Sequence, residues 1–455
     1  MEKMFKRSVL GVAILGAVAG VSIVTAPVAS AEGFFEDSSI GGAVNIWHRN
    51  RDRGNTVNGE DTRMETNVNS TSLYAGLGFN SGYVSDIVGF DFNIYATADL
   101  QNNGSPDHEM NFWDVDNPYD KTPASNSCDG TWSSACTTDG VAVQTAAAKF
   151  KMGDVATAKL GYFQPSVPSA LGVNWSFAAG TYTGGEIGAN FGDLQVGAVV
   201  ADSYRAPWFQ SSYEFRTSEG KDAGSAYSVG ARYTLSNGLL FDTAYAGLTD
   251  GDRKNFHLKL KYTTDSGLYL SPQLYVVKDD EQYKDTAAQL AFLASKSFGV
   301  YSVRAEATMT AADSGDAASV GNMAYRLTQT YGGSNGAYDI WWNNRSDFNH
   351  DGELAVFASV ARDFSDIGAQ GFNAGVSGAY GTGAKAEGYK ELKEGAISAF
   401  ANYAIQDGAL KGANVGFYYT RYENDTDAPN WTGYTNSFQD EEDFKLTLTM
   451  PFSVK

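Results

Sequence analysis

The chain has 455 residues, with 50 glycines, only 10 prolines and a formal net charge of −20 at pH 7. So negative a net charge argues against nucleic acid as a partner, because nucleic-acid binding requires a basic face. Its mean hydropathy of −0.30 resembles that of a soluble protein. Alternating strands hide an apolar face within such an average, however, so a transmembrane β-barrel is not excluded.

The start of the chain has the three parts of an export signal. Residues 3–7 contain three basic side chains, residues 9–24 are apolar, and residues 29–31 have the small side chains of a cleavage site. A membrane helix over the same apolar stretch is the alternative, but the cleavage site follows it directly. We therefore expect a signal peptide over residues 1–31 and a single barrel domain over residues 32–455.

The segment from Val88 to Leu100 has a period of two, which is typical of a β-strand with one apolar and one polar face. The apolar face consists of Val88, Phe90, Phe92, Ile94 and Ala96, and the other of Asp91, Asn93, Tyr95, Thr97 and Asp99. About ten residues of a tilted strand cross a bilayer core. The pattern recurs along the chain and predicts a transmembrane barrel. A secreted sandwich or propeller is the alternative, and no repeat of propeller length is present.

Eighteen strands are predicted in chain order. They start near Ile40, Leu73, Ile87, Val143, Ala156, Glu186, Leu194, Tyr227, Leu239, Asn255, Leu268, Ala288, Val300, Leu354, Phe372, Ile397, Asn414 and Phe444. Long connections over residues 49–70, 101–140, 164–184, 203–225, 312–352, 381–394 and 423–442 alternate with short Gly/Asn/Asp turns such as 236–238, 264–267 and 406–408. The predicted fold class is thus all-β: an antiparallel transmembrane barrel with long extracellular loops, short periplasmic turns and both termini on the periplasmic side.

The polar face of this pattern predicts the lining of a lumen. The basic residues expected there are Arg49, Arg51, Arg232, His257, Lys259, Lys261, Arg304 and Lys445, and those expected on the lipid side are Phe90, Phe92, Ile94, Leu258, Leu260, Leu446 and Leu448. Charged side chains facing lipid near the middle of the membrane would be costly. A barrel of sixteen to eighteen strands leaves an aqueous channel, so a channel is the expected outcome.

Several segments resemble OprD-family outer-membrane porins, and within that family the chitoporin branch. They are the block from Tyr331 to Phe357 with SNGAYDIWWNNRSDFNHDGELAVF, the motifs GYFQP at 161–165, NWSF at 174–177 and RAPW at 205–208, the turn from 406 to 412, and FQDE at 438–441. The matches extend over the whole expected mature chain. The resemblance implies an eighteen-stranded, monomeric barrel whose third and seventh loops, residues 164–184 and 312–352, narrow the pore beside a ladder of basic residues. The chain departs from the family in its cysteine-containing loop and in ending PFSVK without a terminal aromatic residue.

The aromatic residues of the long loops are candidates for a sugar-stacking track, because the apolar C–H faces of sugar rings suit aromatic rings. The predicted substrate-binding residues are Trp175, Phe177, Tyr182, Trp341, Trp342, Asn344 and Arg345, the last two bonding hydroxyl or acetamido groups. If residues 341 and 342 are extended, one ring anchors the loop and the other faces the sugar. The alternative is that these rings pack the loops and that Asp339 pairs with Arg345 to hold the loop shut.

Asp347, Asn349, Asp351 and Gly352 have the spacing of a calcium loop, which offers oxygen ligands at alternate positions. The closing glutamate of such a loop is missing, because Ala358 stands there, and a plain turn stabilised by Asp and Asn side chains is the alternative. No other cofactor is expected.

Cys128 and Cys136 lie close together in a polar loop of an exported chain. An oxidising compartment favours a disulfide between them.

We expect a porin of the outer membrane of a Gram-negative bacterium, in contact with lipid and lipopolysaccharide, that admits small hydrophilic solutes passively. Chitooligosaccharides are the first candidate, and basic amino acids, peptides or carboxylates the second. A barrel enzyme or surface adhesin is the third hypothesis. None of the four histidines has a nucleophile or acid partner in a known motif, so we expect no enzyme.

Overall fold

The computed structural model describes residues 33–53, 56–57, 60–61, 68–102, 111–113, 137–315, 319–328, 334–343, 348–425 and 440–455. Eighteen long strands in this part form one closed antiparallel barrel, as predicted. They are β1 (Ser39–Arg53), β4 (Val68–Asn80), β5 (Val88–Asn102), β8 (Gly140–Met152), β9 (Ala156–Phe163), β11 (Thr181–Phe191), β12 (Leu194–Arg205), β14 (Ala226–Thr234), β15 (Leu240–Leu248), β16 (Lys254–Thr263), β17 (Tyr269–Lys278), β18 (Ala287–Phe298), β19 (Tyr301–Ala311), β21 (Leu354–Asp363), β22 (Phe372–Thr382), β23 (Lys393–Ala404), β24 (Asn414–Asn424) and β25 (Asp440–Ser453).

The remaining described elements are short. They are β2 (Thr56–Val57), β3 (Glu60–Asp61), β6 (Phe112–Trp113), β7 (Thr137–Thr138), β10 (Leu171–Gly172), β13 (Tyr213–Glu214), β20 (Asn335–Gly336) and the 3₁₀ turn η3 (Ser365–Ile367). Among the described residues, no helix has both the length and the apolar character needed to span a membrane.

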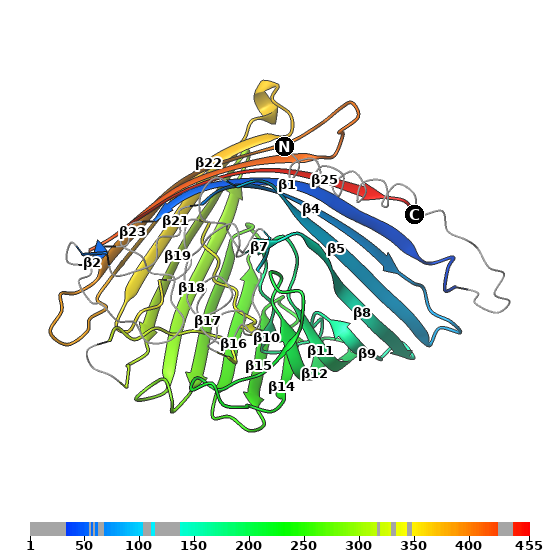
Figure 1. Cartoon of the computed structure of the whole chain (residues 1–455), viewed down its shortest axis with the longest axis horizontal. Helices are drawn as coiled ribbons and strands as arrows, with labels where there is room; N and C mark the ends of the chain where they lie inside the picture. Colours follow the sequence, from blue (N-terminus) through cyan, green and yellow to red (C-terminus); the bar gives the residue numbers. More distant parts are fainter. Residues whose placement is uncertain are drawn as a thin grey trace.

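The barrel closes where the first long strand meets the last. Each long strand pairs with its neighbours in the chain, and β1 pairs with β4 on one side and β25 on the other, from Gly41 opposite Ser453 to Arg53 opposite Glu441. Figure 1 shows the blue β1 beside the red β25. Because all the backbone bonds of this ring run between strands, no sheet edge faces lipid.

Alternation along the strands separates an inner face from an outer one. In β18, Gln289, Ala291 and Leu293 are buried, whereas Leu290 and Phe292 are exposed on the outside. In β16, His257 and Lys259 are likewise buried on the inner face, as the predicted register requires. The predicted lipid-facing residues Phe90, Phe92 and Leu446 are exposed, and Ile94, Leu258, Leu260 and Leu448 are half-buried on the same outer face.

Connections alternate between tight turns and long loops, also as predicted. Gly238 and Gly267 complete two of the turns with φ of 83° and 77°, values that favour glycine over other residues. Four strands begin at least four residues closer to the long loops than predicted: β4 at Val68 rather than Leu73, β11 at Thr181 rather than Glu186, β23 at Lys393 rather than Ile397 and β25 at Asp440 rather than Phe444. The added segments consist mostly of polar residues and glycine, so the backbone ladder continues where the apolar alternation has ended.

Candidate pore and constriction loops

Loop 3, here residues 164–180 between β9 and β11, folds inward along the barrel wall. A row of three glycines crosses the wall here, because Gly197 of β12 is the register partner of Gly188 on β11 and of Gly230 on β14. A side chain added at Gly197 would place its Cβ 2.6 Å from the Cβ of Val167 and 2.8 Å from the carbonyl oxygen of Pro168. The three glycines therefore leave the space in which loop 3 lies, and the predicted inward fold of this loop is confirmed.

Polar contacts fix loop 3 at both ends of this glycine row. The backbone N–H and the hydroxyl of Ser166 donate to the Glu186 carboxylate at 2.8 and 2.5 Å. The N–H of Ala170 donates to the Ser228 hydroxyl at 2.8 Å. Since Glu186 and Ser228 are both buried on the inner face, the loop is attached to the wall rather than spanning open solvent.

Loop 7, here residues 312–353 between β19 and β21, joins loop 3 inside the barrel. Leu171–Gly172 and Asn335–Gly336 pair as the two-stranded sheet β10–β20, and β10 lies within the ring of strands in Figure 1. The fully buried Tyr182 donates its hydroxyl to the carbonyl of Gly172 at 2.7 Å. The two loops thus form one constriction element, an association that the sequence reading did not foresee.

Basic residues of β16 hold loop 7 against the wall. Lys259 donates to the Asp339 carboxylate at 2.7 Å and to the carbonyl of Ala337 at 2.8 Å. Lys261 lies 2.6 Å from the other Asp339 oxygen. Burial by itself would raise the pKa of Asp339, but the two ammonium groups outweigh burial and lower that pKa. In the alternative interpretation of the sequence, Asp339 pairs with Arg345. In the structure its carboxylate forms ion pairs with Lys259 and Lys261.

The predicted aromatic residues fall into two groups. Trp175 and Trp341 are 75% and 70% exposed, whereas Phe177, Tyr182 and Trp342 are buried. Phe177 packs against the rings of Tyr95 and Phe112 with centroids 5.7 and 6.0 Å away. Phe177 and Tyr182 consequently hold loop 3 in place, and only Trp175 and Trp341 of these five offer a free ring.

The two neighbouring tryptophans have different surroundings, as predicted for an extended backbone: one ring is anchored and the other is exposed. Trp342 stacks on Phe357 at 5.3 Å and donates its indole N–H to Glu306 at 2.9 Å, while the carbonyl of Trp341 accepts from Arg304 at 2.7 Å. Trp342 is therefore the anchor and Trp341 the exposed ring. Asn344 and Arg345 lie outside the described residues.

Acidic partners accompany the predicted basic residues of the inner wall. Arg49 forms a bidentate salt bridge with Asp443, in which Nε and Nη2 donate to the two carboxylate oxygens at 2.8 Å each. Other pairs are Lys445 with Asp443 at 3.1 Å, Arg232 with Asp242 at 3.1 Å, His257 with Asp242 at 3.6 Å and Arg304 with Glu306 at 2.8 Å, and Arg51 is buried on the inner face of β1. The alternation of the sequence also places Glu306 on the lumen side, but it did not single out Asp242 and Asp443. A search for opposite charges two residues apart on a strand would have found Asp443.

Four of the predicted basic residues remain partly exposed despite their partners. They are Arg232, Lys261, Arg304 and Lys445, on β14, β16, β19 and β25. The lumen therefore presents positive groups along several strands although the chain as a whole is acidic.

The side chains of the predicted calcium loop bond to the protein itself. Asn349 donates its amide to the carbonyl of Met323 at 2.8 Å, and the Asp351 carboxylate accepts the N–H of Ala312 at 2.6 Å. Asp347 lies outside the described residues, as do Cys128 and Cys136.

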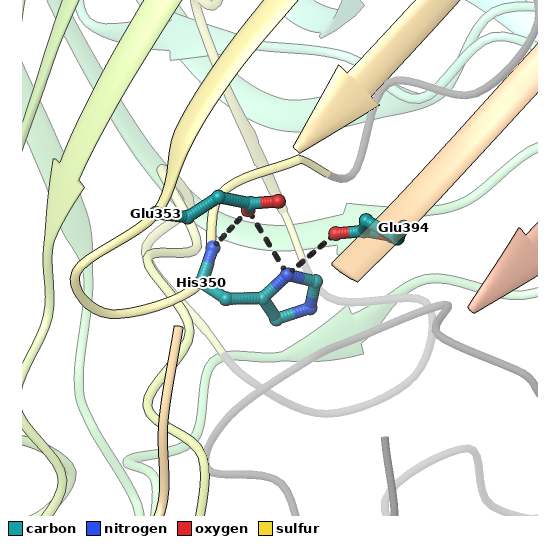
Figure 2. Close-up of side chains that lie close together, drawn as sticks. All are labelled: His350, Glu353 and Glu394. Atoms are coloured by element: carbon teal, nitrogen blue, oxygen red, sulfur yellow. Dashed lines mark hydrogen bonds and ion pairs between the residues drawn. The ribbon is translucent and has the colours of Figure 1, made fainter. Parts of the chain in front are cut away.

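His350, between those two residues, meets two carboxylates that the sequence reading did not single out. Its Nδ1 lies 3.1 Å from a Glu353 oxygen and 2.9 Å from a Glu394 oxygen (Figure 2). Burial by itself would lower the pKa of His350, but the two carboxylates outweigh burial and raise that pKa to about 10. Burial and the charge of Glu394 raise the pKa of Glu353 to about 8.

Comparison with known proteins agrees with this architecture. The family model described as outer membrane porin, OprD family, matches residues 32–454. A chitoporin of Escherichia coli K12 is 35% identical over 99% of this chain and 98% of its own. Among solved structures, Pseudomonas aeruginosa OpdO matches with a TM-score of 0.70 and 15% identity over 93% of this chain and 99% of its own. P. aeruginosa OpdK with vanillate matches with a TM-score of 0.69 and 17% identity over 92% and 100%.

These structural matches establish the fold, and the family match establishes the kind of protein. The barrel, the inward loops and the polar lumen are those of a passive channel of the Gram-negative outer membrane, not of an enzyme. The chain belongs to the OprD family of outer-membrane porins.

Proposed function

We propose that this porin admits chitooligosaccharides by passive diffusion. The observation that carries the proposal is the exposed indole of Trp341, held at the lumen by Trp342, Glu306 and Arg304. A flat ring fixed in this way suits the apolar face of a sugar, and the neighbouring Arg304 guanidinium suits an acetamido oxygen. The 35% identity to a chitoporin supports the same substrate class.

Recognition in a channel has to be weak, because each solute must also leave. One stacked ring contributes about 1 kcal/mol, which corresponds to a ~5-fold change in binding. Trp175, Asn344 and Arg345 belong to the same proposed track, which spreads such contacts along the path of the sugar. No cofactor takes part in diffusion of this kind, and calcium binding by Asp347, Asn349 and Asp351 stays a separate prediction.

Single-channel recording with chitohexaose tests the proposal. We expect Trp341→Ala to raise the sugar concentration that half-blocks the current about 5-fold and to leave open-channel conductance unchanged. Tyr380→Ala is the matched control, because Tyr380 is an exposed ring on the outer face of β22. Equal block in both variants and the wild type would contradict the role of Trp341.

A second substrate class has its own observation. The partly exposed cations Arg232, Lys261, Arg304 and Lys445 favour carboxylates, and the related fold of OpdK was solved with vanillate. Block of the current by vanillate but not by chitohexaose would favour this class. Block by arginine or by basic peptides would instead indicate that acidic groups select the solute.

We also propose that the porin acts as a monomer in a leaflet containing lipopolysaccharide. The closed eighteen-stranded ring needs no second chain to complete its lumen. Native mass spectrometry of the purified porin, with and without added lipopolysaccharide, tests both statements.

A further inference from the structure

Three buried ionisable side chains meet where loop 7 approaches the barrel wall. His350 and Glu353 belong to the end of loop 7, and Glu394 is the second residue of β23. Their side chains are 0%, 0% and 2% exposed. Figure 2 shows the imidazole and both carboxylates turned toward one another. These residues, here called the His–Glu–Glu cluster, share no residue with the exposed tryptophans or the lysine–Asp339 contact.

The spacing of the cluster suits a small ion. Nδ1 of His350 lies 3.1 Å from a Glu353 oxygen and 2.9 Å from a Glu394 oxygen, and the potential ligand atoms all lie within 4.8 Å of one another. Zinc bonds of roughly 2.0–2.1 Å in tetrahedral geometry place ligand atoms ~3.3 Å apart. Only small shifts of the side chains would bring all three onto one ion.

The carboxylates are short of donors. Oε1 of Glu353 is fully buried and has no hydrogen-bond partner among the described residues. A Cβ at Gly381 of β22 would collide with this oxygen, so the glycine leaves the space that it occupies. A buried carboxylate oxygen without a donor is costly, and a cation is one way to satisfy it.

The surroundings orient the Glu394 carboxylate. Its second oxygen accepts a hydrogen bond from Tyr422 at 2.5 Å, and Asn424 donates in turn to the Tyr422 oxygen at 3.0 Å. Outer hydrogen bonds of this kind fix ligand carboxylates in metal sites. The Glu394 oxygen facing His350 therefore points into the cluster.

We propose that the His–Glu–Glu cluster is a binding site for a divalent transition-metal ion of the zinc class. The ion would displace the protons that His350 and Glu353 carry at neutral pH. Two carboxylates and a neutral imidazole then balance its charge, so the occupied site carries no net charge inside the protein. One nitrogen and few oxygens suit zinc, whereas calcium takes six to eight oxygen ligands. The ion would tie the end of loop 7 to β23 and so add a second attachment of the constriction element, on a different strand from the lysine contacts of β16.

Metal analysis of the full-length porin tests this proposal. The protein, purified without a histidine tag, is stripped with EDTA, titrated with Zn²⁺ and measured by inductively coupled plasma mass spectrometry after desalting. We expect one Zn²⁺ per chain, a higher thermal unfolding temperature with the metal, and with Co²⁺ an absorption band in the visible range. A folded wild-type porin that retains no Zn²⁺ would overturn the proposal and leave a proton shared within the cluster.

Two variants locate the ion. Glu394→Gln removes one ligand charge at nearly constant size and should weaken Zn²⁺ binding at least 10-fold. Glu186→Gln is the matched control, because Glu186 is another buried glutamate of the inner wall that contacts loop 3 instead, and it should bind Zn²⁺ like the wild type. If Glu394→Gln does not fold, His350→Gln takes its place. Unchanged Zn²⁺ binding in a folded cluster variant would also overturn the proposal.

Discussion

The glycine row beneath loop 3 gives the sharpest prediction about pore size. In Gly197→Ala the new Cβ would lie 2.6 and 2.7 Å from Cβ and Cγ2 of Val167 and 2.8 Å from the carbonyl oxygen of Pro168. Ordinary contacts between carbon atoms are about 3.5–4.0 Å, so the loop has to move by ~1 Å. Because loop 3 stays attached at Ser166 and at β10, it moves toward the pore axis.

Two opposing contributions set the change in the free energy of unfolding of Gly197→Ala. Overpacking of this kind costs about 1–3 kcal/mol, and replacing a strand glycine by alanine returns about 0.5–1 kcal/mol. We therefore expect Gly197→Ala to lower the free energy of unfolding by roughly 1–2 kcal/mol and to reduce single-channel conductance. Urea unfolding in lipid vesicles and planar-bilayer recordings measure the two effects.

A matched variant separates the loop from the strand. Gly378→Ala makes the same change on β22, where the nearest atom to the new Cβ is the Ala396 carbonyl oxygen at 3.9 Å. It should keep wild-type conductance and gain slightly in stability. Gly197→Ala with the conductance and stability of Gly378→Ala would refute the packing of loop 3 on the glycine row.

Three further predictions concern the loops. Deleting residues 167–178 should raise conductance, and an unchanged value in a correctly folded variant would argue against loop 3 as a constriction. The contact of Asp339 with Lys259 should be intact at every pH above about 4, near the unfolded pKa of an aspartate, and should weaken as acid protonates the carboxylate below its lowered folded pKa. The single-channel conductance should therefore stay constant from pH 5 to 8 and change in stronger acid. In Asp339→Asn the same change in conductance should appear already at pH 7. If that variant has the conductance of the wild type at pH 7, the contact is excluded. Cys128 and Cys136 should resist thiol reagents in the unreduced protein, and two titrating thiols would disprove the disulfide.

Sequence alternation predicted the strands well because successive side chains of a membrane-crossing strand face lipid and lumen in turn. His257 and Leu258 are forced to opposite faces in this way. The register shifts at bulges in only three pairs of the described long strands, β4–β5, β5–β8 and β11–β12. The strand ends were placed less well at Val68 and Asp440, where the ladder extends beyond the apolar alternation.

The constriction could not be predicted in the same way. Strands β10 and β20 have two residues each and lie far apart in the chain. Segments this short show no periodic alternation of polar and apolar residues from which they could be predicted. Likewise nothing in the sequence distinguishes Trp341 from Trp342, because which ring turns inward depends on Glu306 and Phe357 of the neighbouring strands. Contacts between distant segments decide these features.

The pairing of β1 with β25 has a consequence for how the porin is made. Arg49 and Asp443 are separated by 394 residues, so the seam between the first and last strands forms only after the whole chain has been exported. Until then both terminal strands expose unpaired backbone that invites association with other chains. The seam is therefore the last part of the ring to close, and a chain truncated before residue 440 would leave β1 paired with β4 alone.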